Sequence, residues 1–259
     1  MTINYTTKHK TEMIEEIREC SLDIVYFAEK YFTIINFKNG KEVIKLPQFQ
    51  KNLLYNFVEK KNTVVLAPRQ SFKTTTSLIY ALWYGVFNSN KRIVLLYNNK
   101  NMSKITLLEL KTAYEELPEF LKPAIVKYDS NSIHFDNDSQ ITVESLRPDS
   151  MRGMTPDVVI IDEFAFVNKT IAKEFFVSHF PIYEQNHTKL IISSTPTNTK
   201  TIFYDIWNNA SLGSNTFTPI RVYWWEIAGR DENWRDEMIN FMGKTNFSRE
   251  YDCKFEDEN

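Results

Sequence analysis

The chain has 259 residues, of which 42% are hydrophobic and 14% aromatic, enough to bury the core of a large globular domain and too apolar for a disordered chain. Its 31 Lys and Arg nearly balance 33 Asp and Glu, so a chain-wide basic surface for nucleic acid is excluded and any DNA contact is expected to be local. With two cysteines and no apolar run of roughly 18 residues, the sequence also excludes a disulfide framework, a Cys-based zinc module and a membrane span.

The N-terminal part is predicted to be mainly helical. Apolar residues recur at helical spacing over residues 11–32, which predicts one or two helices. A short strand is predicted over 41–44, after the turn residues Asn39-Gly40, and a helix over 51–59. We expect residues 1–45 to form a helical lead-in to a domain that spans 46–259.

An alternation of strands and helices then predicts the fold class. Helices are expected over 74–86 and 103–117. Four short aliphatic runs are too continuous for half-exposed strands and suit a parallel sheet covered on both faces: residues 63–66, 92–97, 158–161 and 189–193. The sequence therefore predicts an α/β fold.

Two further segments extend this pattern. Residues 132–146 alternate on both sides of a turn at 136–139, which predicts an antiparallel hairpin added at an edge of the sheet. A last strand is predicted over 221–225 and a polar helical region over 231–251. The acidic end after residue 254 has no closing element, as expected of a segment cut from a longer protein.

Residues 67–74 (APRQSFKT) lie between the strand at 63–66 and the helix at 74–86, the strand–loop–helix context of a phosphate-binding loop. Lys73 can reach the β- and γ-phosphates of a nucleotide, and Thr74 can ligate Mg²⁺. The same residues also fit a plain capped helix with a solvated lysine.

The loop departs from the usual GxxxxGK[ST] pattern, because Ala67 and Phe72 stand where glycines are typical. Arg69 and Gln70 add donors in the loop. We expect Phe72 to hold a helical backbone with its ring pointing away from the nucleotide, which affects affinity more than function.

Residues 158–163 (VVIIDE) form an apolar strand that ends in two carboxylates. Alternation along a strand points Asp162 and Glu163 in different directions, so Asp162 can hold Mg²⁺ while Glu163 polarises an attacking water. The alternative is an acidic pair that caps a helix or faces solvent.

Three weaker motifs fit a nucleotide site. In LPQFQ (46–50) Gln50 can read the adenine edge with Phe49 packed nearby, and SSTP (193–196) can sense the γ-phosphate. In SMRGMTPD (150–157) Arg152 can act as a transition-state finger, in cis or toward a neighbouring subunit. The alternatives are an ordinary helix start, a Ser/Thr-rich turn and a solvated arginine. The four histidines show no metal-ligand spacing.

Taken in order, these motifs resemble the N-terminal ATPase of the large terminase subunit of tailed bacteriophages. The RQ-x-x-KT loop, the RG before PDVVIIDE and the STP after the next strand are the most specific. The resemblance covers about residues 46–196, and the stretch 234–255 looks like the approach to that family's nuclease domain.

The resemblance implies an RecA-like (ASCE-type) P-loop NTPase, with ATP and Mg²⁺, that drives double-stranded viral DNA into a procapsid. It implies a homo-oligomeric ring on the portal protein, the small terminase subunit as a partner, no membrane contact, and a place in the host-cell cytoplasm. The nuclease domain is expected to follow residue 259, so we expect ATPase activity without DNA cleavage.

By motif matching the resemblance also assigns roles. Glu163 matches the catalytic carboxylate, with Lys73 as Walker A lysine, and Arg152 and Arg69 compete as arginine finger. Thr74 and Asp162 match the Mg²⁺ ligands. The remaining sets are the ATP-binding residues Phe49, Gln50, Pro68, Arg69, Gln70, Ser71, Phe72, Lys73, Thr74 and Thr75, and the coupling residues Ser194, Thr195 and Pro196.

Two other functions stay open on the residues alone. A superfamily-2 helicase shares these motifs, but it needs a second RecA-like domain that the about sixty residues after Pro196 cannot hold. A P-loop module that only assembles with partners is suggested by Ala67 and Phe72. Unwinding of a tailed duplex and titration with an ATP analogue discriminate these hypotheses.

Overall fold

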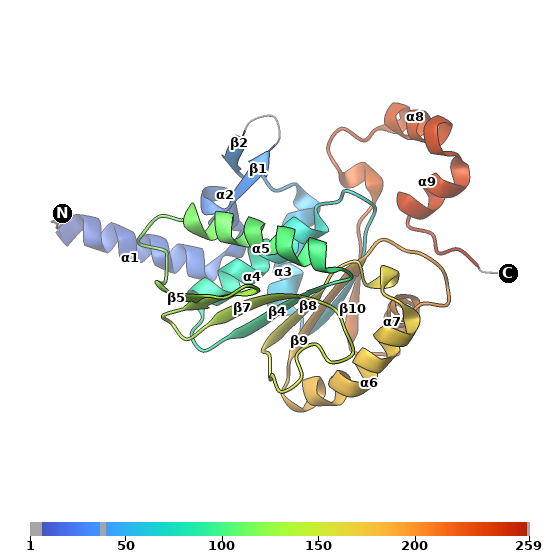
Figure 1. The fold of residues 1–259 in the computed structure, drawn as a ribbon. Helices are drawn as coiled ribbons and strands as arrows, with labels where there is room; N and C mark the ends of the chain where they lie inside the picture. Colours follow the sequence, from blue (N-terminus) through green and yellow to red (C-terminus); the bar gives the residue numbers. More distant parts are fainter. Residues whose placement is uncertain (1–6, 37–39, 258–259) are drawn as a thin grey trace.

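A computed structural model of the chain describes residues 7–36 and 40–257, and its centre is an eight-stranded sheet (Figure 1). From β10 through β7 neighbouring strands are parallel, whereas β6 runs antiparallel to β7 and β5. The order is β10 (Phe217–Arg221), β3 (Asn62–Leu66), β9 (Lys189–Ser194), β8 (Val158–Ile161), β4 (Arg92–Tyr97), β7 (Gln140–Ser145), β6 (Ser132–Phe135) and β5 (Ile125–Tyr128). The α/β prediction is confirmed, as are the four aliphatic strands.

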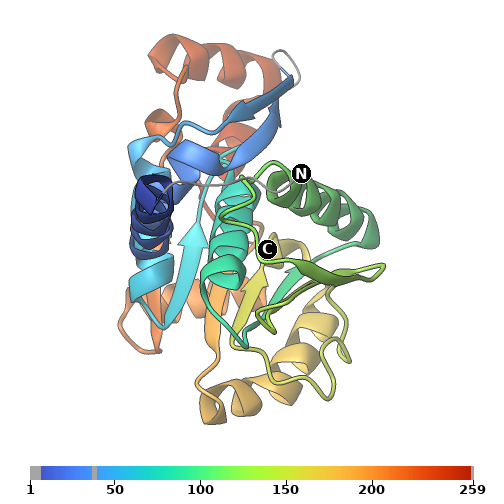
Figure 2. The same ribbon diagram turned by 90° about the vertical axis from the view of Figure 1, so that its left-hand side faces the viewer.

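Helices cover both faces of this sheet (Figures 1 and 2). Alternation along each strand divides the core in two: Val65 packs on one face, and Val64 and Leu66 on the other. One face is covered by α3 (Gln48–Glu59), α4 (Lys73–Phe87) and α5 (Lys100–Glu115), and the other by α6 (Lys169–Gln185) and α7 (Ile202–Ser211). Continuous aliphatic strands thus result from burial on both sides.

The N-terminal lead-in packs on the α3–α4 face. It comprises α1 (Thr7–Leu22), α2 (Ile24–Tyr31) and an antiparallel ribbon of β1 (Thr33–Asn36) and β2 (Gly40–Val43). Asp23 separates the helices, because its carboxylate accepts the amides of Val25 and Tyr26 and starts α2. The predicted turn residue Asn39 lies outside the described residues, and the domain boundary after residue 45 stays a prediction.

The predicted hairpin is present as β6 and β7, but β7 also pairs with β4 and therefore belongs to the main sheet. The edge is formed by β5, a mostly exposed strand that the hydrophobic pattern did not reveal. The strand predicted over 221–225 was wrong: β10 ends at Arg221. This strand contains Pro219, which an edge strand tolerates because one side of its backbone needs no partner.

The C-terminal segment packs as a small aromatic group beside the sheet (Figure 1, red). It holds the 3₁₀ turn η2 (Trp224–Glu226), α8 (Glu232–Met242) and α9 (Lys244–Glu250). Trp224, Phe247 and Tyr251 are buried at its centre. Over the described ranges, the helices are all too short or too polar to cross a membrane.

Candidate nucleotide site

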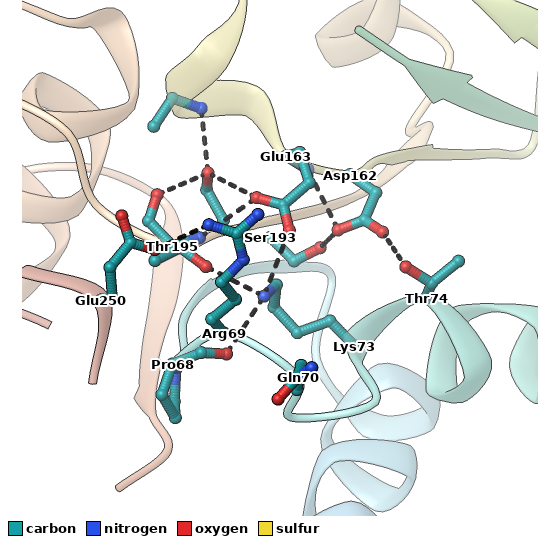
Figure 3. A network of polar contacts seen from close by, with 12 residues as sticks. Pro68, Arg69, Gln70, Lys73, Thr74, Asp162, Glu163, Ser193, Thr195 and Glu250 are labelled. Atoms are coloured by element: carbon teal, nitrogen blue, oxygen red, sulfur yellow. Dashed lines mark hydrogen bonds and ion pairs between the residues drawn. The ribbon is translucent and has the colours of Figure 1, made fainter. Parts of the chain in front are cut away.

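Three adjacent strands bring the predicted motifs together at one edge of the sheet. Strand β9 lies between β3 and β8, so the residues that follow these strands meet at their carboxyl ends (Figure 3). The phosphate-binding loop follows β3, the acidic pair follows β8, and Thr195 follows β9. An additional strand between the loop strand and the acid-bearing strand is what an ASCE-type NTPase requires.

Lys73 is the first residue of α4 and points into the centre of this site (Figure 3). Its side chain is only 5% exposed, and its Nζ lies 3.3 Å from Oε1 of Glu163. The same ammonium donates to the carbonyl of Pro68 at 3.3 Å and to Oγ1 of Thr195 at 3.2 Å. A buried cation at a helix N-terminus is an arrangement suited to anionic phosphate.

Thr74 and Asp162 lie next to each other. Thr74 Oγ1 donates to Oδ2 of Asp162 at 2.5 Å, and Ser193 Oγ donates to Oδ1 at 2.6 Å. Asp162 is almost fully buried. A hydroxyl and a carboxylate oxygen are the hard donors that Mg²⁺ prefers when phosphate oxygens and water complete its shell, so these residues fit the predicted ion.

Glu163 turns away from its neighbour. Its backbone is left-handed, with φ 54° and ψ 41°, a conformation that costs a non-glycine residue about 1–2 kcal/mol. Oε2 accepts the Thr195 amide and the Ser194 hydroxyl, both at 3.4 Å. Burial raises the pKa of Glu163; Lys73 opposes this effect and Asp162 adds to it. A strained carboxylate with a raised pKa is typical of functional sites.

The phosphate-binding loop reaches its shape without glycine. Gln70 (φ 57°) and Phe72 (φ 58°) are both left-handed, the conformation in which glycine is most easily accommodated. Phe72 is thus helical in the left-handed sense, and its ring is 54% exposed. The loop carries the strain that the missing glycines would relieve.

We expect Phe72→Gly to be more stable than Phe72→Ala by about 1 kcal/mol, because alanine keeps the left-handed strain and glycine does not. Both variants remove the ring, so their difference isolates the backbone. Denaturant unfolding of the two variants measures it. Equal unfolding free energies would mean that residue 72 is not held in this conformation.

The predicted adenine residues lie beside the loop. Phe49 and Gln50 line a cavity of about 660 Å³ together with Phe72 and Thr75. Gln50 is buried, and its Nε2 donates to Oγ1 of Thr76 at 2.9 Å, which ties α3 to α4. Contact with adenine therefore stays a prediction for Gln50.

The two candidate arginine fingers differ in position. Arg69 lies in the loop, and its guanidinium is 3.5 Å from the carboxylate of Glu250 in α9 (Figure 3). Arg152 is exposed in the crossover between β7 and β8, beside left-handed Met151 and Gly153. Within the described residues, the Arg152 side chain joins neither Lys73 nor the acidic pair, as a finger that serves a neighbouring subunit requires.

The sequence missed three residues that touch the site. Ser193 was noted only as the start of SSTP, yet it holds Asp162; alternation at the end of β9 was the available signal. Glu250 and Arg230 contact the loop from the C-terminal segment. No motif marks them, because the contacts span more than 150 residues.

Comparison with known families decides what this arrangement is. Residues 64–259 match the model of the family described as terminase large subunit, T4likevirus-type, N-terminal. The chain belongs to this family. The match covers the terminase loop, the acidic pair, the coupling motif and the C-terminal segment, and the recognition from motifs is confirmed.

Solved terminase structures share the fold. The large terminase ATPase domain of Thermus phage P74-26 aligns with a TM-score of 0.67 at 19% identity, over 82% of this chain and 94% of that chain. The HK97 bacteriophage large terminase gives 0.73 at 16%, over 91% and 55%. A large terminase from a thermophilic bacteriophage, in complex with ADP, gives 0.63 at 10%, over 82% and 54%. The present terminase chain thus spans about half of the latter two.

Proposed function

We propose that this terminase segment hydrolyses ATP and uses the cycle to move double-stranded DNA into a procapsid. The observation that carries the proposal is the contact of Lys73 with Glu163 at 3.3 Å, beside the Thr74–Asp162 pair. These groups are the phosphate cation, the water-polarising carboxylate and the metal ligands of a nucleotide hydrolase.

The residues divide the chemistry among them. Lys73 binds the β- and γ-phosphates, and an entering phosphate competes with Glu163 for the same ammonium. Released from Lys73, Glu163 orients and polarises the attacking water. Thr74 and Asp162 would hold Mg²⁺, which neutralises phosphate charge when bound. Ser194 and Thr195, which contact Glu163, can pass a change at the γ-phosphate to β9 and Pro196.

The wider context belongs to the same proposal. We place the chain in the host-cell cytoplasm, as a homo-oligomeric ring that contacts viral DNA, the portal protein and the small terminase subunit. We propose ATP hydrolysis without DNA cleavage for this segment. In support, the residues described here contain no group of three His, Cys, Asp or Glu side chains arranged to hold a metal ion.

Lys73→Ala is expected to weaken binding of Mg²⁺-ATP about 10- to 100-fold, because a charged hydrogen-bond donor to phosphate is lost. Equilibrium titration with a fluorescent ATP analogue measures this loss, and phosphate release measures turnover. Lys173→Ala, an exposed lysine on α6, is the matched control. Unchanged affinity in the Lys73 variant would refute the assignment, and a wild-type chain that binds no nucleotide would support an assembly module instead.

A further inference from the structure

Arg230 connects the C-terminal segment to the phosphate-binding loop. It lies between η2 and α8, and its NH2 donates to the carbonyl of Arg69 at 3.0 Å and to that of Gln70 at 3.3 Å. Its guanidinium also lies over two rings, 4.9 Å from the centroid of Trp234 and 5.2 Å from that of Tyr251. Arg230 therefore joins the aromatic group and the loop.

This arginine is not held by a carboxylate. Among the described residues it takes part in no ion pair, and its NH1 is buried without a hydrogen-bond partner. Burying a guanidinium in this way is unfavourable unless other contacts offset it. The two loop carbonyls and the two ring faces are the contacts that do so.

The same segment contacts the loop a second time. The backbone carbonyl of Glu250 accepts the amide of Arg69 at 2.9 Å, and its carboxylate pairs with the guanidinium of Arg69 at 3.5 Å. Arg249 holds the other carboxylate oxygen at 3.1 Å. Arg69 is thus fixed on both sides of its backbone.

The two contacts of Arg230 determine which way the loop amides face. In a trans peptide unit the carbonyl and the N–H point in opposite directions. When Arg230 draws the carbonyls of Arg69 and Gln70 toward itself, the N–H groups of Gln70 and Ser71 point away from it. A phosphate-binding loop works by turning such amides toward the ligand.

We propose that Arg230 is a positioning residue of the nucleotide site. It fixes the peptide units 69–70 and 70–71 so that the amides of Gln70 and Ser71 face the phosphates. It does so in a loop without glycine, where left-handed Gln70 and Phe72 oppose that shape. The inference rests on the proposed nucleotide-binding function and adds a residue from outside the motifs that define it.

The test compares Arg230→Met with Arg230→Lys. Methionine keeps an apolar stem between Trp234 and Tyr251 and removes the donors, whereas lysine keeps one charged donor. Arg235→Ala is the matched control, because Arg235 lies in α8 and pairs with Glu232 rather than with the loop. Thermal unfolding shows that each variant is folded.

Two readouts are expected to move together. Backbone ¹⁵N order parameters of Arg69, Gln70 and Ser71 are expected to fall from about 0.85 to below about 0.6 in the methionine variant. Affinity for a fluorescent ATP analogue with Mg²⁺ is expected to fall at least about tenfold. The lysine variant is expected to lie between wild type and Arg230→Met in both, and Arg235→Ala to match wild type.

Unchanged loop order in Arg230→Met would overturn the proposal, and so would lost order with unchanged affinity. A wild-type chain that binds no nucleotide would instead refute the proposed function. In that case the order parameters still report whether Arg230 restrains the loop, so the two failures are distinguishable.

Discussion

Glu163→Gln is expected to lower ATP turnover by a factor of about 10²–10⁴ and to leave nucleotide binding intact. Glutamine has nearly the same shape, so the contacts with Ser194 and Thr195 can persist. It has no negative charge with which to polarise water, and this is the property that the proposed reaction needs. Single-turnover hydrolysis and equilibrium binding measure the two quantities separately.

The control is Glu174→Gln, which alters an exposed carboxylate on α6. The pH dependence gives a second check. Because burial raises the pKa of Glu163 above its ordinary 4.5, wild-type turnover is expected to fall with acidification through that raised pKa. An acid limb at or below 4.5, or substantial turnover in Glu163→Gln, would assign the catalytic base to another residue.

Arg152→Ala is expected to lower turnover by a factor of about 10³–10⁵ under conditions where the chain assembles. Arg152 is exposed and distant from the Lys73 site of its own subunit, so the loss is expected only where a neighbouring subunit supplies the arginine. Wild-type turnover per chain is then expected to rise with protein concentration. Arg147→Ala, on the same crossover, is expected to turn over like wild type.

A mixing experiment separates the two arrangements. Arg152→Ala keeps Glu163, and Glu163→Gln keeps Arg152, so mixed subunits contain sites that combine both residues. Turnover is expected to reappear on mixing if Arg152 acts on a neighbour. Failure to recover, together with a comparable loss in Arg69→Ala, would identify Arg69 as the finger in cis.

The sequence predicted the parts of the fold that depend on burial. Strands such as β8 are buried on both faces, so their aliphatic residues are continuous and easy to recognise. The exposed strand β5 and the proline-containing edge strand β10 have no such pattern. These elements are held by neighbours that are distant in sequence, and local residue preferences do not identify them.

The same distinction applies to the site. Lys73, Asp162 and Glu163 follow predicted strands directly, so parallel packing brings them together once the strands are known. The left-handed backbone of Phe72 could not be predicted, because phenylalanine disfavours it. Arg230 and Glu250 were missed because their partners in the loop lie 161 and 181 residues away.

The contacts of Arg230 and Glu250 with the loop also bear on the order in which the protein matures. During synthesis, a chain that has emerged through β9 already holds Lys73, Asp162 and Glu163. It lacks the segment that holds the carbonyls of Arg69 and Gln70 and the amide of Arg69. Contacts of such long sequence separation form only after the intervening chain exists. The residues that bind phosphate are therefore made early, and the restraint on their loop is completed among the last steps of folding.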